Sequence, residues 1–464
     1  MIALLLTVAY IALTYLSPQE IVPDLATYRP VLWLAVLAMV ASAFSLATKN
    51  FSVLRARQMY LLVGLILAIL LSEFAQGWLG GAMFSMGKFL PAAAVFFLIS
   101  INVMQWKHLR IVVVSVIACA TILILQGLWA YVHYNGAESL FIFRQNIFEH
   151  NHLIRTVPRM RSVGSLHDPN DFAQFLLVTL PLIGLLWNQS HIRRVAVTLL
   201  MATALTGIYL THSRGALVGI AVLLLVILWR RVGRVLATIA SVGILLGAVA
   251  LNFAGGRAIS VDGGMDRLRI WSDGLEMFKH APVFGIGFGR FSDFGTHTAH
   301  NSFLLCFAEL GLIGTFFWAA LLVTTTLELN GMAQCEDGKS GNKAAYTSSE
   351  SQPRRFRVQG RASGSIPSNS TIPSPVDAAR WARALRLSLI AFVATAWFLS
   401  RSYAVTLYLL LGIAVALQNL VSRSIPESDR SLSGSRFHWS TITAAVMIGA
   451  LVLLYASVRA RVMG

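Results

Sequence analysis

The chain has 464 residues, of which 56% are hydrophobic and 12% are charged, and its formal net charge is +17. This balance is far too apolar for a soluble globular domain, so it excludes that class and indicates a protein of the lipid bilayer. The basic excess by itself would fit a nucleic-acid binder, but the placement of the charges points elsewhere.

Apolar runs that approach the roughly 20 residues of a membrane-spanning helix recur along the whole chain. A bilayer offers no water to satisfy backbone groups, so such runs must be helices. We therefore expect an all-α, polytopic membrane protein with about 12–14 transmembrane helices. The thirteen runs lie near 2–16, 31–48, 60–76, 89–104, 111–132, 171–187, 195–211, 215–229, 235–253, 302–327, 384–400, 403–421 and 440–457.

Basic residues are concentrated in alternate connections between these runs. By the positive-inside rule those connections are cytoplasmic, and this placement explains most of the positive charge. We therefore expect membrane lipids, and no nucleic acid, as partners. Thirteen spans leave one conflict, because Arg459 and Arg461 would then lie on the outer side. Examples of the basic connections are 49–57, 107–110, 193–194, 230–234 and 339–361.

The chain divides by composition into four parts. Residues 1–132 hold N-terminal transmembrane helices, and 133–327 hold a core with long outward connections. A basic stretch rich in Ser, Gly and Pro at 328–383 reads as a disordered cytoplasmic linker, and 384–464 hold C-terminal transmembrane helices. The three cysteines are isolated, so no disulfide framework or metal site is indicated.

The outward connection before residue 302 carries a short amphipathic helix. Met265, Leu268, Trp271, Leu275 and Phe278 recur at helical spacing, and the pattern ends at a proline. We expect this helix to lie on the outer leaflet. The glycines at 285, 287 and 289 follow no strand and precede no lysine, so they indicate a tight backbone turn and not a phosphate loop.

His300 and Asn301 stand at the start of the run 302–327. Asn301 is a good helix N-cap, with His300 as its solvated neighbour. A neutral imidazole at this position could instead accept a proton from a sugar hydroxyl. His167 is a second histidine candidate, and it precedes Asp168 and Asn170, which read either as a helix cap or as sugar-binding residues.

Several arginines lie in the outward connections, against the topological bias. A single one is readily explained by a side chain that reaches from the interface into water. A convergent set indicates an anionic ligand, because a guanidinium binds phosphate bidentately and keeps its charge. The outward connections carry no Asp-x-Asp pair of the kind that holds Mg²⁺, and a metal-free diphosphate site would need arginines instead. These arginines are Arg161, Arg214, Arg267, Arg269 and Arg401.

Taken together, these motifs resemble the O-antigen ligase and polymerase superfamily of bacterial envelope membrane proteins. The matching segments are RSVGSLHDPN at 161–170, SRG at 213–215, RLRIW at 267–271, PVFGIGFGRF at 282–291 and HNSFL with ELGLIG at 300–314. They occur in the order found in the family. The resemblance covers roughly 160–320, and SRSY near 401 is similar to the family's C-terminal pattern.

The resemblance implies a metal-independent, inverting glycosyltransferase at the periplasmic face of the bacterial inner membrane, with no cofactor. Its donor would be a glycan on undecaprenyl diphosphate. His300 would be the catalytic base, and Arg214 and Arg267 would stabilise the leaving diphosphate. Arg161, Asp168, Asn170, Arg269, Asn301 and Arg401 would bind substrate.

The acceptor stays open at this point. A lipid A core would make the protein a ligase, a second lipid-linked repeat would make it a polysaccharide polymerase, and a Ser or Thr hydroxyl would make it a protein O-oligosaccharyltransferase. A transporter or flippase of lipid-linked glycans is the alternative from another class. It predicts charged residues in the middle of the spans, which are scarce here.

Overall fold

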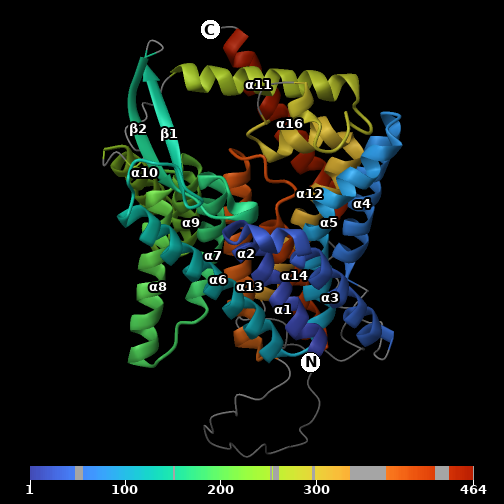
Figure 1. Ribbon diagram of the computed structural model, residues 1–464, viewed down its shortest axis with the longest axis vertical. Coiled ribbons are helices and arrows are strands. Elements are labelled where there is room, and N and C mark those ends of the chain that lie inside the picture. The colour runs from blue at the N-terminus through green and yellow to red at the C-terminus, as the bar shows by residue number, and fades with distance from the viewer. Residues whose placement is uncertain are drawn as a thin grey trace, which may run out of the picture.

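The computed structural model describes residues 1–47, 56–149, 152–250, 253, 261–294, 298–334, 373–423 and 438–462. Helices dominate this part of the chain (Figure 1). In order they are α1 (Ile2–Leu16), α2 (Pro18–Ile21), α3 (Pro30–Ala47), α4 (Arg57–Ala75), α5 (Leu79–Asn102), α6 (Trp106–Val132), α7 (Pro169–Gly184), α8 (His191–Leu210), α9 (Arg214–Val232), α10 (Arg234–Ala250), α11 (Val261–His280), α12 (Ser302–Gln334), α13 (Pro375–Ala396), α14 (Val405–Ser422) and α16 (Trp439–Val462).

Each of the thirteen apolar runs coincides with a helix, which confirms the all-α, multi-pass fold. Ten of the helices among the described residues are long and apolar enough to cross a membrane. The other three are α7, α10 and α13. Helix α7 has 16 residues, α10 is a shorter apolar helix, and α13 carries several charged side chains.

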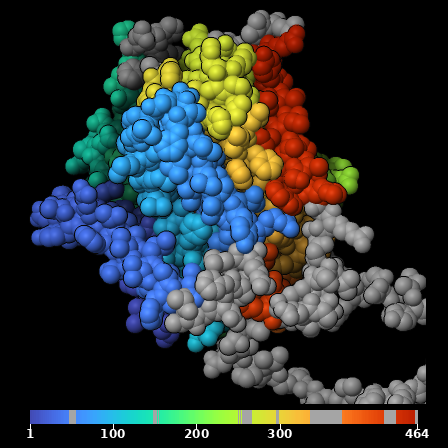
Figure 2. Space-filling view, turned by 90° about the vertical axis from the view of Figure 1, so that its right-hand side faces the viewer, coloured from blue at the N-terminus to red at the C-terminus, as the bar shows by residue number. Residues whose placement is uncertain are grey.

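The centre of the bundle is formed by α12 and α14, whose apolar windows are 72% and 78% buried. Helix α14 packs on α5, whereas α12 packs on α4, α13 and α16. The view in Figure 2 shows part of α12 between the N-terminal helices α4 and α5 and the C-terminal helix α16. Between α7 and α13, Gln174 donates to the Thr395 hydroxyl at 2.7 Å, the kind of polar contact that joins helices in lipid.

The two ends of the molecule carry different elements (Figure 1). The N-terminus lies at one end, and α11 lies across the other, where α16 also ends. The predicted amphipathic helix is thus confirmed, with Trp271, Leu275 and Met277 buried and Glu276 exposed on its other side. The same end carries α11, the hairpin described next and the last turn of α16, so Arg459 lies with them.

A β-hairpin is the first feature that the sequence did not predict. Strands β1 (Ile142–Glu149) and β2 (His152–Met160) pair antiparallel, from Ile142 opposite Met160 to Glu149 opposite His152. A register shift follows Ile147. The hairpin projects beside α11 at the end of the molecule (Figure 1), within what the sequence placed as an irregular outward connection.

A break in α12 is the second such feature. Gly311 has φ 61° and ψ −160°, so the helix is interrupted there. The glycine-rich segment after α11 fills the gap with its backbone: the Ile286 N–H donates to the Ala308 carbonyl at 2.9 Å, and the Leu312 N–H donates to the Pro282 carbonyl at 2.8 Å. The predicted tight turn is real, and it also satisfies backbone groups that the break exposes.

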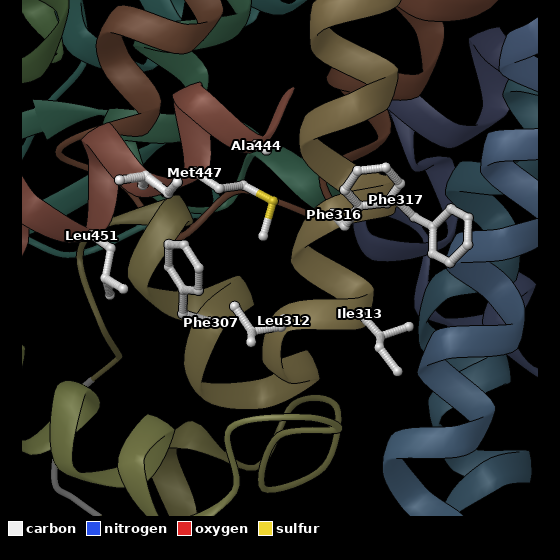
Figure 3. A pocket seen from close by; sticks show the side chains of 9 residues that line it. Phe307, Leu312, Ile313, Phe316, Phe317, Ala444, Met447 and Leu451 are labelled. Atoms are coloured by element: carbon white, nitrogen blue, oxygen red, sulfur yellow. The ribbon is translucent and has the colours of Figure 1, made fainter. Parts of the chain in front are cut away.

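Beside this break, α12 and α16 enclose an apolar hollow of about 420 Å³. Figure 3 shows Phe307 from before the break and Leu312 and Phe316 from after it, facing Met447 and Leu451 of α16. All of the lining side chains are apolar.

The bounds of the predicted cytoplasmic linker differ from the helix ends on both sides. Helix α12 continues past residue 327 to Gln334, and α13 begins at Pro375 and not near 384. The intervening residues 335–372 lie outside the described part of the chain, so the predicted disorder there stays a prediction.

Candidate active site at the outward turns

Arg214 begins a membrane helix at the end of the molecule that carries α11. The turn before α9 places Ser213 as the N-cap, where its hydroxyl accepts from the Ala216 N–H at 3.4 Å. His212 precedes it with φ 50°, in the left-handed region that residues other than glycine seldom occupy. Its Nδ1 lies 2.7 Å from the Phe253 carbonyl, which holds the ring in one orientation.

Two further arginines approach Arg214 from other elements. Arg159 extends from β2, is 3% exposed, and donates from Nε to the Thr211 carbonyl at 2.8 Å. Arg267 extends from α11. We call Arg159, Arg214 and Arg267 the arginine cluster. Three guanidinium groups from three separate elements are the arrangement expected of an anion site.

The mutual effects of their charges place these three groups near one another. The pKa of Arg159 is lowered to about 10, chiefly by burial; the charge of Asp168 opposes this shift, and the charge of Arg214 adds to it. The pKa of Arg267 is also lowered, first by loss of hydration and then by the charge of Arg214, although its side chain still reaches solvent. At neutral pH both groups keep their positive charge, so a bound anion would relieve the repulsion.

His300 lies between two anchored residues. The Trp271 indole N–H of α11 donates to the carbonyl of Ala299 at 3.1 Å. On the other side, Asn301 donates from Nδ2 to the Trp397 carbonyl at 3.0 Å. His300 itself has φ 49°, so its backbone is held in a conformation that costs free energy. Such conformations persist where the surroundings fix them, and they gather at functional sites.

Asn301 is the N-cap of α12. Its Oδ1 accepts from the N–H groups of Phe303 and Leu304 at 2.9 and 3.0 Å, and the residue is fully buried. The capping interpretation is therefore confirmed for Asn301, while the function of His300 stays a prediction. Arg267 lies one helical turn before Trp271, so the contact that anchors Ala299 also fixes the helix that carries Arg267.

The residues around the start of α7 divide between two roles. Asp168 caps α7 by accepting from the Asn170 N–H at 2.7 Å. The Asn170 side chain accepts from Arg159 at 2.9 Å, so Asn170 joins the arginine cluster through a residue that the sequence did not single out.

Arg161 is occupied by its own connection. It donates to the Ser139 carbonyl at 2.8 Å, forms an ion pair with Glu138 at 3.1 Å, and lies 3.2 Å from Nε2 of His167. Arg161 therefore fixes the loop that enters the hairpin. The structure does not bring it to Arg214 by any contact among the described residues.

Arg269 and Arg401 also differ in their surroundings. Arg269 faces solvent on α11 and pairs weakly with Asp266 at 3.8 Å. Arg401 forms a bidentate ion pair with Asp171, which is 5% exposed, and its backbone N–H donates to the Ser302 hydroxyl at 2.8 Å. Arg401 thus links the first turn of α7 to the first turn of α12.

Sequence reasoning missed Arg159 and His212. Arg159 lies two residues before the RSVGSLHDPN motif, and only the hairpin brings it to Thr211. His212 had a visible signal, because His-Ser at 212–213 and His-Asn at 300–301 both place a histidine directly before a helix cap. Both histidines take positive φ in the structure.

Comparison with known proteins agrees with these observations. Residues 196–319 match the model of a family described as O-antigen ligase. The matched segment runs from α8 through α9, α10 and α11 into the first part of α12. It contains Arg214, Arg267 and His300. A search of curated proteins found no match. Over residues 196–319 the chain is therefore similar to the O-antigen ligase family, which supports the resemblance to the O-antigen ligase/polymerase superfamily.

Proposed function

We propose that the protein is a metal-independent, inverting glycosyltransferase that moves a glycan from undecaprenyl diphosphate to an acceptor hydroxyl. The observation that carries this proposal is the arginine cluster, which lies within or against the family-matched segment. Its three guanidinium groups suit the diphosphate of a lipid-linked donor. The apolar surfaces of the surrounding helices suit the polyprenyl tail.

In the proposed reaction, His300 removes the proton of the acceptor hydroxyl as that oxygen attacks the anomeric carbon. The bond from the anomeric carbon to the diphosphate oxygen breaks, and its electron pair leaves with the diphosphate. Arg214 and Arg267 stabilise the negative charge that grows on this leaving group. A single displacement inverts the anomeric centre.

We place the reaction at the periplasmic face of the bacterial inner membrane. The support is the charge pattern: α11, which carries Arg267, lies at the end of the molecule opposite the start of α8, where the basic residues 193–194 stand (Figure 1). The acceptor is a lipid A core, a second lipid-linked repeat or a protein hydroxyl, and the first two define ligase and polymerase.

The test uses purified protein in liposomes, with a polyprenyl-diphosphate-linked glycan as donor and excess EDTA present. We expect the wild type to transfer glycan and His300→Ala to lose transfer while donor binding persists. Full transfer by His300→Ala would leave the histidine as a capping neighbour only. If the wild type moves donor between leaflets without transfer, the protein is a flippase.

A further inference from the structure

A polar cavity borders the first turn of α7, the same turn that contacts the arginine cluster. Asn170 faces Arg159, whereas the next residue, Asp171, faces Arg401 and lines the cavity. The cavity has a volume of about 480 Å³, within the roughly 300–1,000 Å³ of small-molecule sites. Thr298, two residues before His300, also lines it.

The lining combines charge, hydroxyls and aromatic rings. Two acidic side chains, Asp171 and Glu309, are offset by two basic ones, Lys88 and Arg401. This balance contrasts with the arginine cluster, which is basic throughout. The remaining lining includes the hydroxyls of Ser165, Ser292, Thr298, Ser400 and Thr406 and the rings of Phe288, Phe291 and Tyr403.

Glu309 is the most informative of these residues. It is 2% exposed and lies two residues before the break in α12. Its Oε1 accepts from the Phe291 N–H at 3.2 Å. Its Oε2 is buried and makes no hydrogen bond in the described structure, and the same is true of the Tyr403 hydroxyl. The Tyr403 hydroxyl and the Gly289 N–H lie close enough to the Glu309 carboxyl to act on its charge as donors, but neither meets the geometry of a normal hydrogen bond.

Buried polar atoms without partners cost free energy, so their occurrence in a cavity lining indicates a ligand that completes them. The ligand must present several hydroxyl groups, because the cavity offers a carboxyl, a phenol and aliphatic hydroxyls together. It must also present an apolar face, because Phe288, Phe291 and Tyr403 border the same space. An uncharged sugar ring has both properties, and the offset charges of the cavity do not favour an anion.

We propose that this cavity is a carbohydrate subsite, in which Glu309 and Tyr403 hydrogen-bond the hydroxyl groups of an uncharged pyranose of the transferred or accepting glycan. This inference rests on the proposed function, because it places a sugar beside a diphosphate site. It assigns specificity to two residues, in the ELGLIG and SRSY segments, to which the sequence analysis gave no function. Arg401 and Asp171 form the wall shared with the first turns of α7 and α12.

The experiment measures binding to the full chain in lipid nanodiscs by microscale thermophoresis. The first probes are undecaprenyl diphosphate and the same lipid bearing one N-acetylglucosamine or one galactose. The second probes are methyl glycosides of those sugars, added to protein already loaded with bare undecaprenyl diphosphate. The first set reports a donor sugar in the cavity, and the second set reports an acceptor sugar.

We expect one set of probes to show binding that depends on the sugar. The affinity for that sugar should fall about tenfold in Glu309→Gln or Tyr403→Phe, which corresponds to the loss of roughly one good hydrogen bond. Glu328→Gln is the matched control, because Glu328 lies at the other end of α12 and contacts Gln58. It should keep the full gain. Size-exclusion profiles and unfolding temperatures must show that both test variants fold.

A sugar-dependent gain that survives both variants, or no gain with either set of probes, overturns the subsite. The proposed function fails separately. If Arg214→Met leaves the binding of bare undecaprenyl diphosphate unchanged, the diphosphate assignment is wrong whatever the sugar probes report.

Discussion

At the scale of single residues, the structure separates arginines that the sequence could not rank. Arg267 and Arg269 lie two positions apart on α11, and both precede Trp271 in the motif. Arg267 is close enough to Arg214 for the two charges to interact, whereas Arg269 pairs with Asp266 in solvent. The electrostatic environment therefore favours Arg267 as the diphosphate ligand.

This difference gives a paired prediction. Arg267→Met should lower kcat/KM for glycan transfer by roughly 10²-fold, the effect of removing one group that stabilises developing charge. Arg269→Met should change it by no more than about twofold, because an exposed ion pair contributes little. Both substitutions remove one charge from the same helix, so a general charge effect would lower both values equally and contradict the assignment.

Arg159 shows why residue-level prediction was incomplete. Its side chain reaches Thr211 and Asn170 because the hairpin carries β2 across to them, a contact over 52 positions in sequence for Thr211. Asn301 could be predicted as a cap because its partners are its own neighbours in sequence. Contacts between neighbours in sequence could be predicted from the sequence, whereas contacts created by tertiary structure could not.

At the scale of elements, the break in α12 joins the glycine-rich segment to the membrane bundle. A Cβ atom on Gly311 would lie 2.5 Å from the Val283 backbone, and one on Gly285 would lie 2.3 Å from that of Glu309. Both glycines also have positive φ. The two backbones therefore approach closely enough that only glycine fits at each position.

Gly311→Ala should destabilise the protein by roughly 2–4 kcal/mol, combining the overpacking and the left-handed backbone. It should also impair sugar binding, because Glu309 and Phe291 flank the docked segment. Gly331→Ala in the same helix is the control: a Cβ there meets nothing within 4 Å. That change should be neutral or stabilising by about 0.5–1 kcal/mol. Thermal unfolding in detergent compares them, and equal unfolding temperatures would contradict the docking.

The elements also show how far the sequence reaches. All thirteen apolar runs became helices, because a long apolar run in lipid has no other stable form. The hairpin and the break at Gly311 were not predicted. The ELGLIG segment is apolar on both sides of its glycine, so nothing local marks an interruption. The interruption is stable because residues 282–287 supply the missing hydrogen bonds from elsewhere in the chain.

At the scale of the whole molecule, the path of α16 bears on the predicted conflict over the C-terminal charges. Helix α16 ends at the same end of the molecule as α11 and the hairpin (Figure 1), so Arg459 lies there. Two explanations of the conflict are open: one apolar run does not span the membrane, or a weak charge signal near Arg459 and Arg461 is overridden. The path of α16 favours the second, because charge near a chain end is outweighed by the helices before it.

Single cysteines test this arrangement. In a background without Cys119, Cys306 and Cys335, we expect Arg459→Cys and Glu276→Cys to react with a membrane-impermeant maleimide on intact spheroplasts. Arg193→Cys should react only after the membrane is opened, because it lies in the first turn of α8, at the opposite end of the molecule (Figure 1). All three side chains are exposed, so accessibility alone does not separate them.

Each result identifies a different error. If Arg459→Cys is protected while Glu276→Cys reacts, one helix between them fails to cross. The candidate is α13, which carries three arginines and did not meet the apolarity of a spanning helix. If Glu276→Cys is protected and Arg193→Cys reacts, the whole molecule is inverted. The arginine cluster would then face the cytoplasm, and the periplasmic placement of glycan transfer would be wrong.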